Sequence, residues 1–224
     1  MATEFGTMRL REDSLASVRF ERLYSGSPGQ VWMALTSADR MSRWLGAAVD
    51  IDPQVGGSIR VSWSAENVMT GEITRYDEPH VLEFTWNEEW LGIASIVRFE
   101  LRAEGSSTVL TLEHLGVPRA QAAGLGAGWH GHLDAIAAEL LGQSLSPQAR
   151  YETLRPEYAQ RFARGGRQGA KQAQLGVAGQ GAHDNRHSER AQLCLEESVP
   201  DRCRASAQTR SKTSTTNMTR HESP

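Results

Sequence analysis

The chain of 224 residues has only two cysteines, Cys194 and Cys203, and both lie in its last third. Residues 1–164 therefore offer no disulfide bond and no thiol for catalysis. The same residues contain no lysine, and their 15 arginines are outnumbered by 21 aspartates and glutamates, which gives a net charge of −6. We expect no nucleic-acid partner, because contacts with phosphate groups require a basic surface.

Long hydrophobic runs are also absent. No segment approaches the roughly 18 consecutive apolar residues of a membrane span. The first residues, MATEFGTMRLRED, lack the apolar core of a signal peptide, and Met8 is an alternative to Met1 as the first residue. We therefore expect a cytoplasmic protein with no membrane partner.

Residues 165–224 contain none of the chain's aromatic side chains and are rich in Gly, Gln, Ser, Thr and Arg. Such a segment cannot bury enough apolar surface to offset its chain entropy, which predicts a disordered tail. Residues 1–14 show no pattern that requires structure, and we expect them to be flexible. A folded domain over 15–145 and a helical extension over 146–164, packed on that domain, complete the predicted organisation.

Seven segments have the composition and alternation of β-strands. They are residues 17–24, 48–51, 58–64, 68–76, 81–86, 93–101 and 108–114. Two short helices are expected after the first strand, one over 28–35 with Ser27 as its cap, and one capped by Ser37 that carries Met41 and Trp44. Short turns join the later strands, so neighbouring strands should pair antiparallel.

Residues 128–141 predict an amphipathic helix whose apolar stripe comprises Trp129, Leu133, Ile136 and Leu140. Glycines 124, 126 and 128 are expected to let the chain turn sharply into this helix. A sheet with one apolar face needs a cover, and this helix has the longest apolar face available. The predicted fold class is α+β, with a curved, antiparallel, seven-stranded sheet wrapped around a long C-terminal helix.

Four segments carry a family resemblance: VWMALTSADRMSRWLG (31–46), VGGSIRV (55–61), GEITRYDEPHVLEFTW (71–86) and GWHGHLDAIAAEL (128–140). Each resembles a motif of the activator of heat-shock-protein-90 ATPase homologue family, of the bacterial single-domain type, within the SRPBCC/START-like superfamily. The extension YETLRPEYAQRF (151–162) is similar to one found in many bacterial members. The resemblance implies the helix-grip (START/Bet v-like) fold over about residues 17–142. It also implies a space between helix and sheet, in which relatives mostly hold an apolar small molecule.

The residues expected to line such a cavity are mainly aromatic. They are Trp44, Trp63, Trp86, Phe99, His114, Trp129, His132 and Leu133. For each of the tryptophans at 63, 86 and 129, a place in the solid core is the competing interpretation. His114 is either hydrogen-bonded inside the core or a polar anchor at the mouth of the cavity.

No catalytic residue, cofactor or metal site is predicted. The chain has no nucleophile elbow, zinc-protease motif, phosphate-binding loop or dinucleotide fingerprint. His130 and His132 lie two residues apart, which places them about 200° apart on a helix and unable to share one ion. The glutamates at 72, 83, 88, 89 and 100 are expected mostly on solvated strand faces.

The sequence is compatible with three functions. The first is non-catalytic binding of a small hydrophobic or aromatic molecule between the sheet and the helix. The second is a cyclase or hydrolase that would use His114 with a carboxylate. The third is a co-chaperone or other interaction domain, with an exposed apolar patch near Trp90 or the 147–164 arm, and with a protein partner or a homodimer as its complex.

Overall fold

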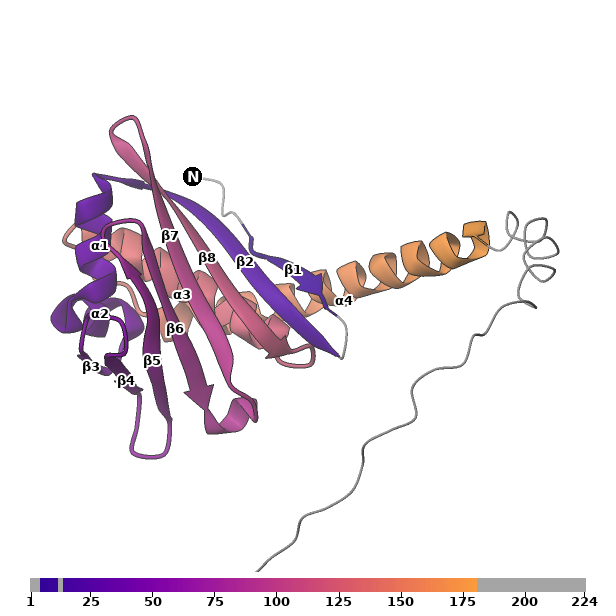
Figure 1. Ribbon diagram of the computed structural model, residues 1–224, viewed down its shortest axis with the longest axis horizontal. Coiled ribbons are helices and arrows are strands. Elements are labelled where there is room, and N and C mark those ends of the chain that lie inside the picture. Colours follow the sequence, from indigo (N-terminus) through magenta and orange to yellow (C-terminus); the bar gives the residue numbers. More distant parts are fainter. Residues whose placement is uncertain (1–4, 12–13, 181–224) are drawn as a thin grey trace, which may run out of the picture. The chain divides into compact units, whose positions relative to one another are not determined.

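The computed structural model of the chain describes residues 5–11 and 14–180, and only the backbone of residues 164–180. Eight strands form one antiparallel sheet in the order β1-β2-β8-β7-β6-β5-β4-β3 (Figure 1). The strands are β1 Thr7–Leu10, β2 Leu15–Ser25, β3 Ala48–Ile51, β4 Ser58–Ser62, β5 Val68–Asp77, β6 Val81–Glu88, β7 Ser95–Glu104 and β8 Ser107–Pro118. The helices are α1 Pro28–Thr36, α2 Ala38–Leu45, the short 3-10 helix η1 Glu89–Leu91, α3 Ala122–Leu140 and α4 Pro147–Gln180. The tail predicted to be disordered spans 165–224, and its residues 181–224 lie outside the described residues.

All seven predicted strands form, and the chain contains one more. Residues Thr7–Leu10, within the segment expected to be flexible, pair with β2 from Thr7 opposite Arg19 to Leu10 opposite Ala16. Four residues without clear alternation are too short to be recognised, and the strand exists because the edge of β2 offers it hydrogen bonds. The predicted seven-stranded sheet wrapped around a helix is therefore wrong in strand number. The sheet is also not strongly curled, and it lies as a twisted layer against one side of α3 (Figure 1).

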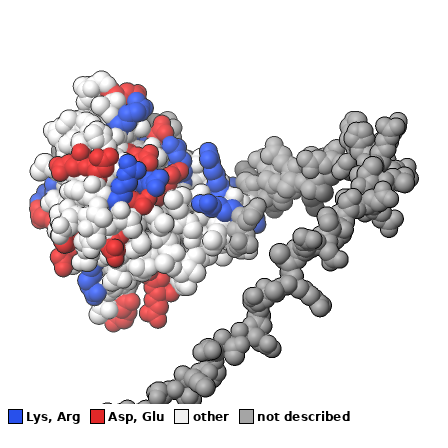
Figure 2. Space-filling model, viewed as in Figure 1, with Lys and Arg blue, Asp and Glu red and all other residues white. Residues whose placement is uncertain are grey.

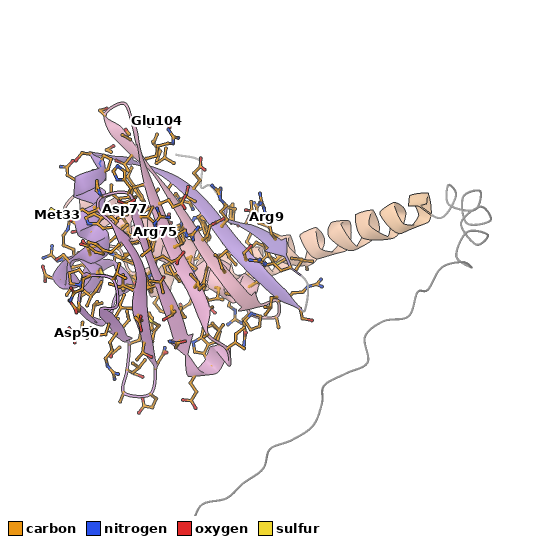
Figure 3. All side chains as sticks on the ribbon, viewed as in Figure 1. Arg9, Met33, Asp50, Arg75, Asp77 and Glu104 are labelled. Carbon is orange, nitrogen blue, oxygen red and sulfur yellow. The ribbon has the colours of Figure 1, made fainter. Side chains whose placement is uncertain are left out.

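The two faces of the sheet differ in chemistry. On the face toward α3, alternate residues of the central strands are buried, among them Phe84, Phe99 and Leu112. The opposite face carries arginines and glutamates of neighbouring strands, such as Arg98 paired with Glu83. Figure 2 shows positive and negative side chains mixed over this face, and Figure 3 shows Arg75 and Asp77 of β5 among them. The core therefore lies on one side of the sheet only, as the alternation predicted.

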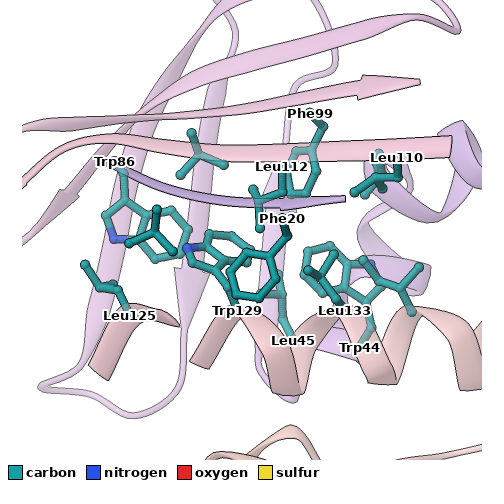
Figure 4. Packing of buried hydrophobic residues seen from close by; sticks show 14 of the residues in the cluster. Phe20, Trp44, Leu45, Trp86, Phe99, Leu110, Leu112, Leu125, Trp129 and Leu133 are labelled. Carbon is teal, nitrogen blue, oxygen red and sulfur yellow. The ribbon is translucent and has the colours of Figure 1, made fainter. Parts of the chain in front are cut away.

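Helix α3 places the predicted apolar stripe against the sheet. Trp129, Leu133 and Ile136 are buried, and Leu140 is partly buried at the end of the helix. Figure 4 shows Trp129 and Leu133 projecting from α3 among the side chains of the sheet. The helix begins at Ala122 rather than at Gly128, so the three glycines expected to form a turn lie inside it.

Two glycines of the helix, Gly126 and Gly131, are explained by what approaches α3. A Cβ atom on Gly126 would lie 2.8 Å from Cδ1 of Tyr158 in α4, and one on Gly131 would lie 2.7 Å from the carbonyl oxygen of Pro147. Close packing of α4 thus requires glycine at both positions. Tertiary packing overrides the low intrinsic helix propensity of glycine at these two positions.

Helix α4 docks through the residues that the sequence singled out. Leu154, Tyr158 and Phe162 are buried, and the Tyr158 hydroxyl accepts a hydrogen bond of 2.9 Å from the Gly6 amide. The helix continues to Gln180, past the end expected near Arg164–Gly166. Alanine, glutamine, lysine and arginine in this stretch favour helix. None of the described helices is long and apolar enough to cross a membrane.

The burial of α3 gives a stability prediction. Replacing Ile136, which is 0% exposed, with alanine leaves a cavity under the helix, and we expect a loss of about 2–5 kcal/mol in the free energy of unfolding. The matched variant Leu141→Ala, just beyond the helix at a side chain that is 65% exposed, should be close to wild type. Urea denaturation measures both, and equal effects of the two variants would contradict the packing described.

Candidate functional site

A cleft of about 640 Å³ lies between the first half of α3, the end of β6 and the docked part of α4. Its walls include five large aromatic side chains that come from separate parts of the chain. They are Trp63 after β4, Trp86 on β6, Trp90 in η1, Trp129 on α3 and Tyr151 on α4. The cleft opens to solvent at the rim, where Trp90 is 50% exposed.

Two glycines of α3 keep the helix side of the cleft clear. Gly124 and Gly128 are one helical turn apart and both line the cleft. A Cβ atom on Gly128 would meet nothing within 4 Å, and one on Gly124 would meet only the Tyr151 hydroxyl at 4.0 Å. Glycine is therefore not needed here for packing within the protein, and its effect is to leave open space along the backbone of the helix.

The indole N–H groups of the three inner tryptophans are bonded within the protein. Trp63 donates to the Leu45 carbonyl at 3.2 Å, Trp86 to Oε2 of Glu88 at 2.9 Å, and Trp129 to Nδ1 of His114 at 3.0 Å. These bonds fix the rings in place and satisfy their only polar atoms. The three side chains thus offer ring surface, and no hydrogen-bond donor, to whatever occupies the cleft.

His114 lies behind Trp129 and is fully buried on β8. Because its Nδ1 accepts from Trp129, its Nε2 carries the proton and donates to the Ser95 hydroxyl at 2.8 Å, which in turn donates to the Trp86 carbonyl at 3.2 Å. Burial lowers the pKa of His114 to about 3, so the ring is neutral at neutral pH. Both nitrogens are occupied, which leaves His114 no free atom for acid–base chemistry.

His130 and His132 point in different directions from α3, as the two-residue spacing predicted. His132 lines the cleft and its Nδ1 bonds the Trp44 carbonyl at 3.1 Å, while burial lowers its pKa to about 4. His130 points toward α4, where its Nδ1 lies 2.9 Å from the Tyr158 hydroxyl, and burial lowers its pKa to about 4. In the part of the chain that the structure describes, no three His, Cys, Asp or Glu side chains converge on a point where an ion could bind.

Polar side chains also line the cleft, and they are Asn67, Glu88, Gln121, His132, Gln148 and Arg155. Glu88 is buried at the end of β6, and the structure describes no protein partner for its second carboxylate oxygen, Oε1. Gln121 donates through Nε2 to the Trp90 carbonyl at 3.2 Å, and its buried Oε1 has no partner. Arg155 of α4 lies at the exposed edge.

The structure brings together four of the eight residues predicted to line a cavity: Trp63, Trp86, Trp129 and His132. The other four, Trp44, Phe99, His114 and Leu133, do not line the cleft and are packed in the core around it. Trp44, for example, donates through its Nε1 to the Ala34 carbonyl at 2.7 Å and joins α2 to α1.

Sequence reasoning missed Glu88, Gln121 and Tyr151 as cleft residues. For Glu88 a signal was present, because the inward alternation of Leu82, Phe84 and Trp86 continues to position 88. For Gln121 and Tyr151 no signal existed, since their position depends on how the loop before α3 and the docked α4 meet.

Comparison with known proteins agrees with this fold. The model of the family described as "Activator of Hsp90 ATPase homolog 1-like protein" matches residues 25–141. The crystal structure of CalU16 from Micromonospora echinospora is similar at 25% identity and a TM-score of 0.59, over 71% of this chain and 94% of that one. The solution structure of the protein encoded by the Bordetella parapertussis gene BPP1335 is 30% identical over 72% of this chain and 93% of that one, with a TM-score of 0.55.

A third similar structure, that of EF2215 from Enterococcus faecalis, is described as a conserved protein of unknown function. It has a TM-score of 0.59 at 22% identity, over 71% of this chain and 91% of that one, and so speaks for the fold alone. No curated protein matches the chain.

The buried histidines predict a pH dependence of stability. The pKa values of His114, His130 and His132 are lowered to about 3, 4 and 4 from 6.5, so below pH 6.5 the unfolded chain binds more protons than the folded one. The three buried neutral histidines should therefore contribute fully to the free energy of unfolding above pH 6.5, and this contribution should be lost as the pH falls toward 4. The expected slope is about 1.4 kcal/mol per pH unit for each histidine.

Urea denaturation between pH 7.5 and about pH 5 measures this slope, in a range where most carboxylates remain ionised. The variant His130→Gln should reduce the slope, whereas His80→Gln, at an exposed side chain, should not. A stability that stays constant from pH 6.5 to 5 would contradict the burial of these rings as neutral species.

Proposed function

The chain belongs to the Activator of Hsp90 ATPase homolog 1-like family, and from this premise we propose that its folded domain binds a small hydrophobic or aromatic molecule in the cleft, without catalysing a reaction on it. The observation that carries the proposal is the aromatic wall over an open stretch of α3. Four tryptophans and a tyrosine surround a space in which Gly124 and Gly128 leave the helix backbone bare.

The dimensions of the cleft support this function. Sites for small molecules usually measure roughly 300–1,000 Å³ and are lined by apolar side chains with a few placed polar groups. The cleft, at about 640 Å³, falls within this range, and its polar lining includes Glu88, Gln121 and His132. A planar ring of the ligand would stack on the indole surfaces, whose N–H groups already have partners.

The site we propose lies at one end of the helix and not beneath its whole length. The space between the middle of α3 and the sheet is filled by buried side chains, among them Phe20, Phe99 and Leu133 (Figure 4). A ligand would therefore enter from the rim beside Trp90 and reach inward as far as the ring of Trp129.

Binding without chemistry is favoured over a cyclase or hydrolase. The base suggested for such an enzyme, His114, has Trp129 on one nitrogen and Ser95 on the other. Glu88 is a carboxylate that faces the cleft, but one of its oxygens is bound to Trp86. An acid–base pair of free groups is therefore not available around His114.

One observation favours a second function, the binding of a protein. Trp90 is 50% exposed and Ile93, three residues further, is 39% exposed, so an apolar area borders the cleft. If a protein partner used this area, Ile93→Ser would abolish capture of that partner and leave small-molecule binding in the cleft unchanged.

The proposed function predicts binding of a neutral aromatic probe. N-phenyl-1-naphthylamine, which fluoresces strongly in apolar surroundings, should bind the wild-type protein with one site. The variant Gly128→Met places a long side chain into the cleft, and binding of the probe should weaken by at least about tenfold, since the open space is filled.

Gly29→Met is the matched control, because Gly29 is an exposed helical glycine of α1 with nothing within 4 Å of its Cβ position. Both variants replace glycine by a better helix former, so neither should lose stability. Unchanged fluorescence enhancement in Gly128→Met would show that the probe binds elsewhere and would overturn the proposed function.

A further inference from the structure

We infer that the cleft selects a molecule that carries a positively charged amino group next to its apolar body, with Glu88 as the counter-ion. The inference rests on the proposed function and adds to it the charge of the ligand. It starts from the polar atoms of the cleft: among the described residues that line it, the one buried side-chain atom without a partner is an acceptor, Oε1 of Gln121, and the buried Glu88 carboxylate has a single donor within the protein.

Glu88 is the only acidic residue that lines the cleft in the described part of the chain, and it is 9% exposed. Its Oε2 accepts from the Trp86 indole, and no arginine, histidine or other cation lies within 4.0 Å of the carboxylate among the described residues. A carboxylate held away from water is costly unless a charge of opposite sign or several donors compensate it. The described residues supply Glu88 with one neutral donor, so a cation in the cleft would compensate its charge further.

Gln121 adds an acceptor without a partner. Its Nε2 donates to the Trp90 carbonyl, which fixes the orientation of the amide and turns Oε1 toward a buried position with no donor. Exchange of the two amide atoms would place two oxygens against each other and is excluded. An acceptor without a partner, together with a carboxylate that has a single donor, favours a ligand rich in N–H donors, as an ammonium group is.

The aromatic walls favour the same charge. Trp86 lies between Trp63, at 6.2 Å between ring centroids, and Trp129, at 5.4 Å, so several indoles stand around the position beside Glu88. The face of an indole ring is negative and attracts a cation, and this attraction grows when water is excluded. Because the N–H groups of these rings are bonded within the protein, their positive edges are not offered to an anion.

Among the described residues, Arg155 is the one arginine or lysine that lines the cleft, and its position does not oppose this conclusion. The residue lies on α4 at the exposed edge, where water and salt screen its charge. Glu88, by contrast, is buried, so its charge acts on a ligand through less water and outweighs that of Arg155 in the interior of the cleft.

Three probes of one shape and different charge test the inference: 2-phenylethylammonium, 2-phenylethanol and 3-phenylpropanoate. Isothermal titration calorimetry with the full chain at neutral pH should show the ammonium ion binding at least about tenfold more tightly than the other two. In the Glu88→Gln variant, the affinity for the ammonium ion should fall to that for the alcohol. The glutamine oxygen can still accept from the Trp86 indole, so the wall of the cleft stays in place.

Glu89→Gln is the matched control, since it removes the same charge from the next residue, which is exposed and does not line the cleft. It should keep the preference for the ammonium ion. Equal binding of the three probes, tightest binding of the carboxylate, or loss of the preference in Glu89→Gln would overturn the charge inference while the aromatic cleft remains a binding site. Failure of all three probes together with N-phenyl-1-naphthylamine would overturn the proposed function as well.

Discussion

The hydrogen bond from the Trp129 indole to His114 joins the helix to the middle of the sheet, and much of the structure depends on it. From His114 the bonding continues through the Ser95 hydroxyl to the Trp86 carbonyl, so one chain of donors and acceptors links α3 to β8, β7 and β6. Each polar atom along it is buried, and each has a partner, which a buried network needs if it is to stabilise the protein. The network fixes one tautomer of His114 and one orientation of Trp129, and with them the inner wall of the cleft.

Helix α3 combines close packing and open space by using glycine on two of its sides. Gly126 and Gly131 let α4 approach, and without them the backbone and Tyr158 of α4 would collide with a side chain. Gly124 and Gly128 meet nothing comparable and leave room at the cleft. The rest of the contact with α4 is polar and specific, since Arg150 donates to Asp134 of α3 at 2.6 Å and Tyr158 lies between Gly6 and His130. The extension thus forms one side of the cleft and is more than an appendage of the domain.

Most of the fold could be predicted from the sequence, and the successes and failures have physical reasons. Alternation of apolar residues, as in Ile59 and Val61 or in Phe84 and Trp86, directly reports a sheet with one buried face. The start of α3 was misplaced, because glycines favour a turn locally, whereas Gly124, Gly126 and Gly128 lie inside the helix and Gly126 packs against α4. Half of the predicted cavity residues line the cleft, since a pattern shows that a side chain points inward but not whether space remains beside it. His114 and Trp129 have the same inward direction, yet only Trp129 reaches the open space.

The glycine content of α3 has a kinetic consequence. Four glycines between Ala122 and Gly131 give this half of the helix little intrinsic stability, so it holds its shape mainly through α4 and the indole network. Segments of this kind open locally at a lower free energy than the core that surrounds them. The same segment forms one side of the cleft, so its local opening would widen the entrance. The residence time of a bound molecule would then depend on how often this half of the helix opens. The packing of α4 against Gly126 and Gly131 would set the rate of that opening.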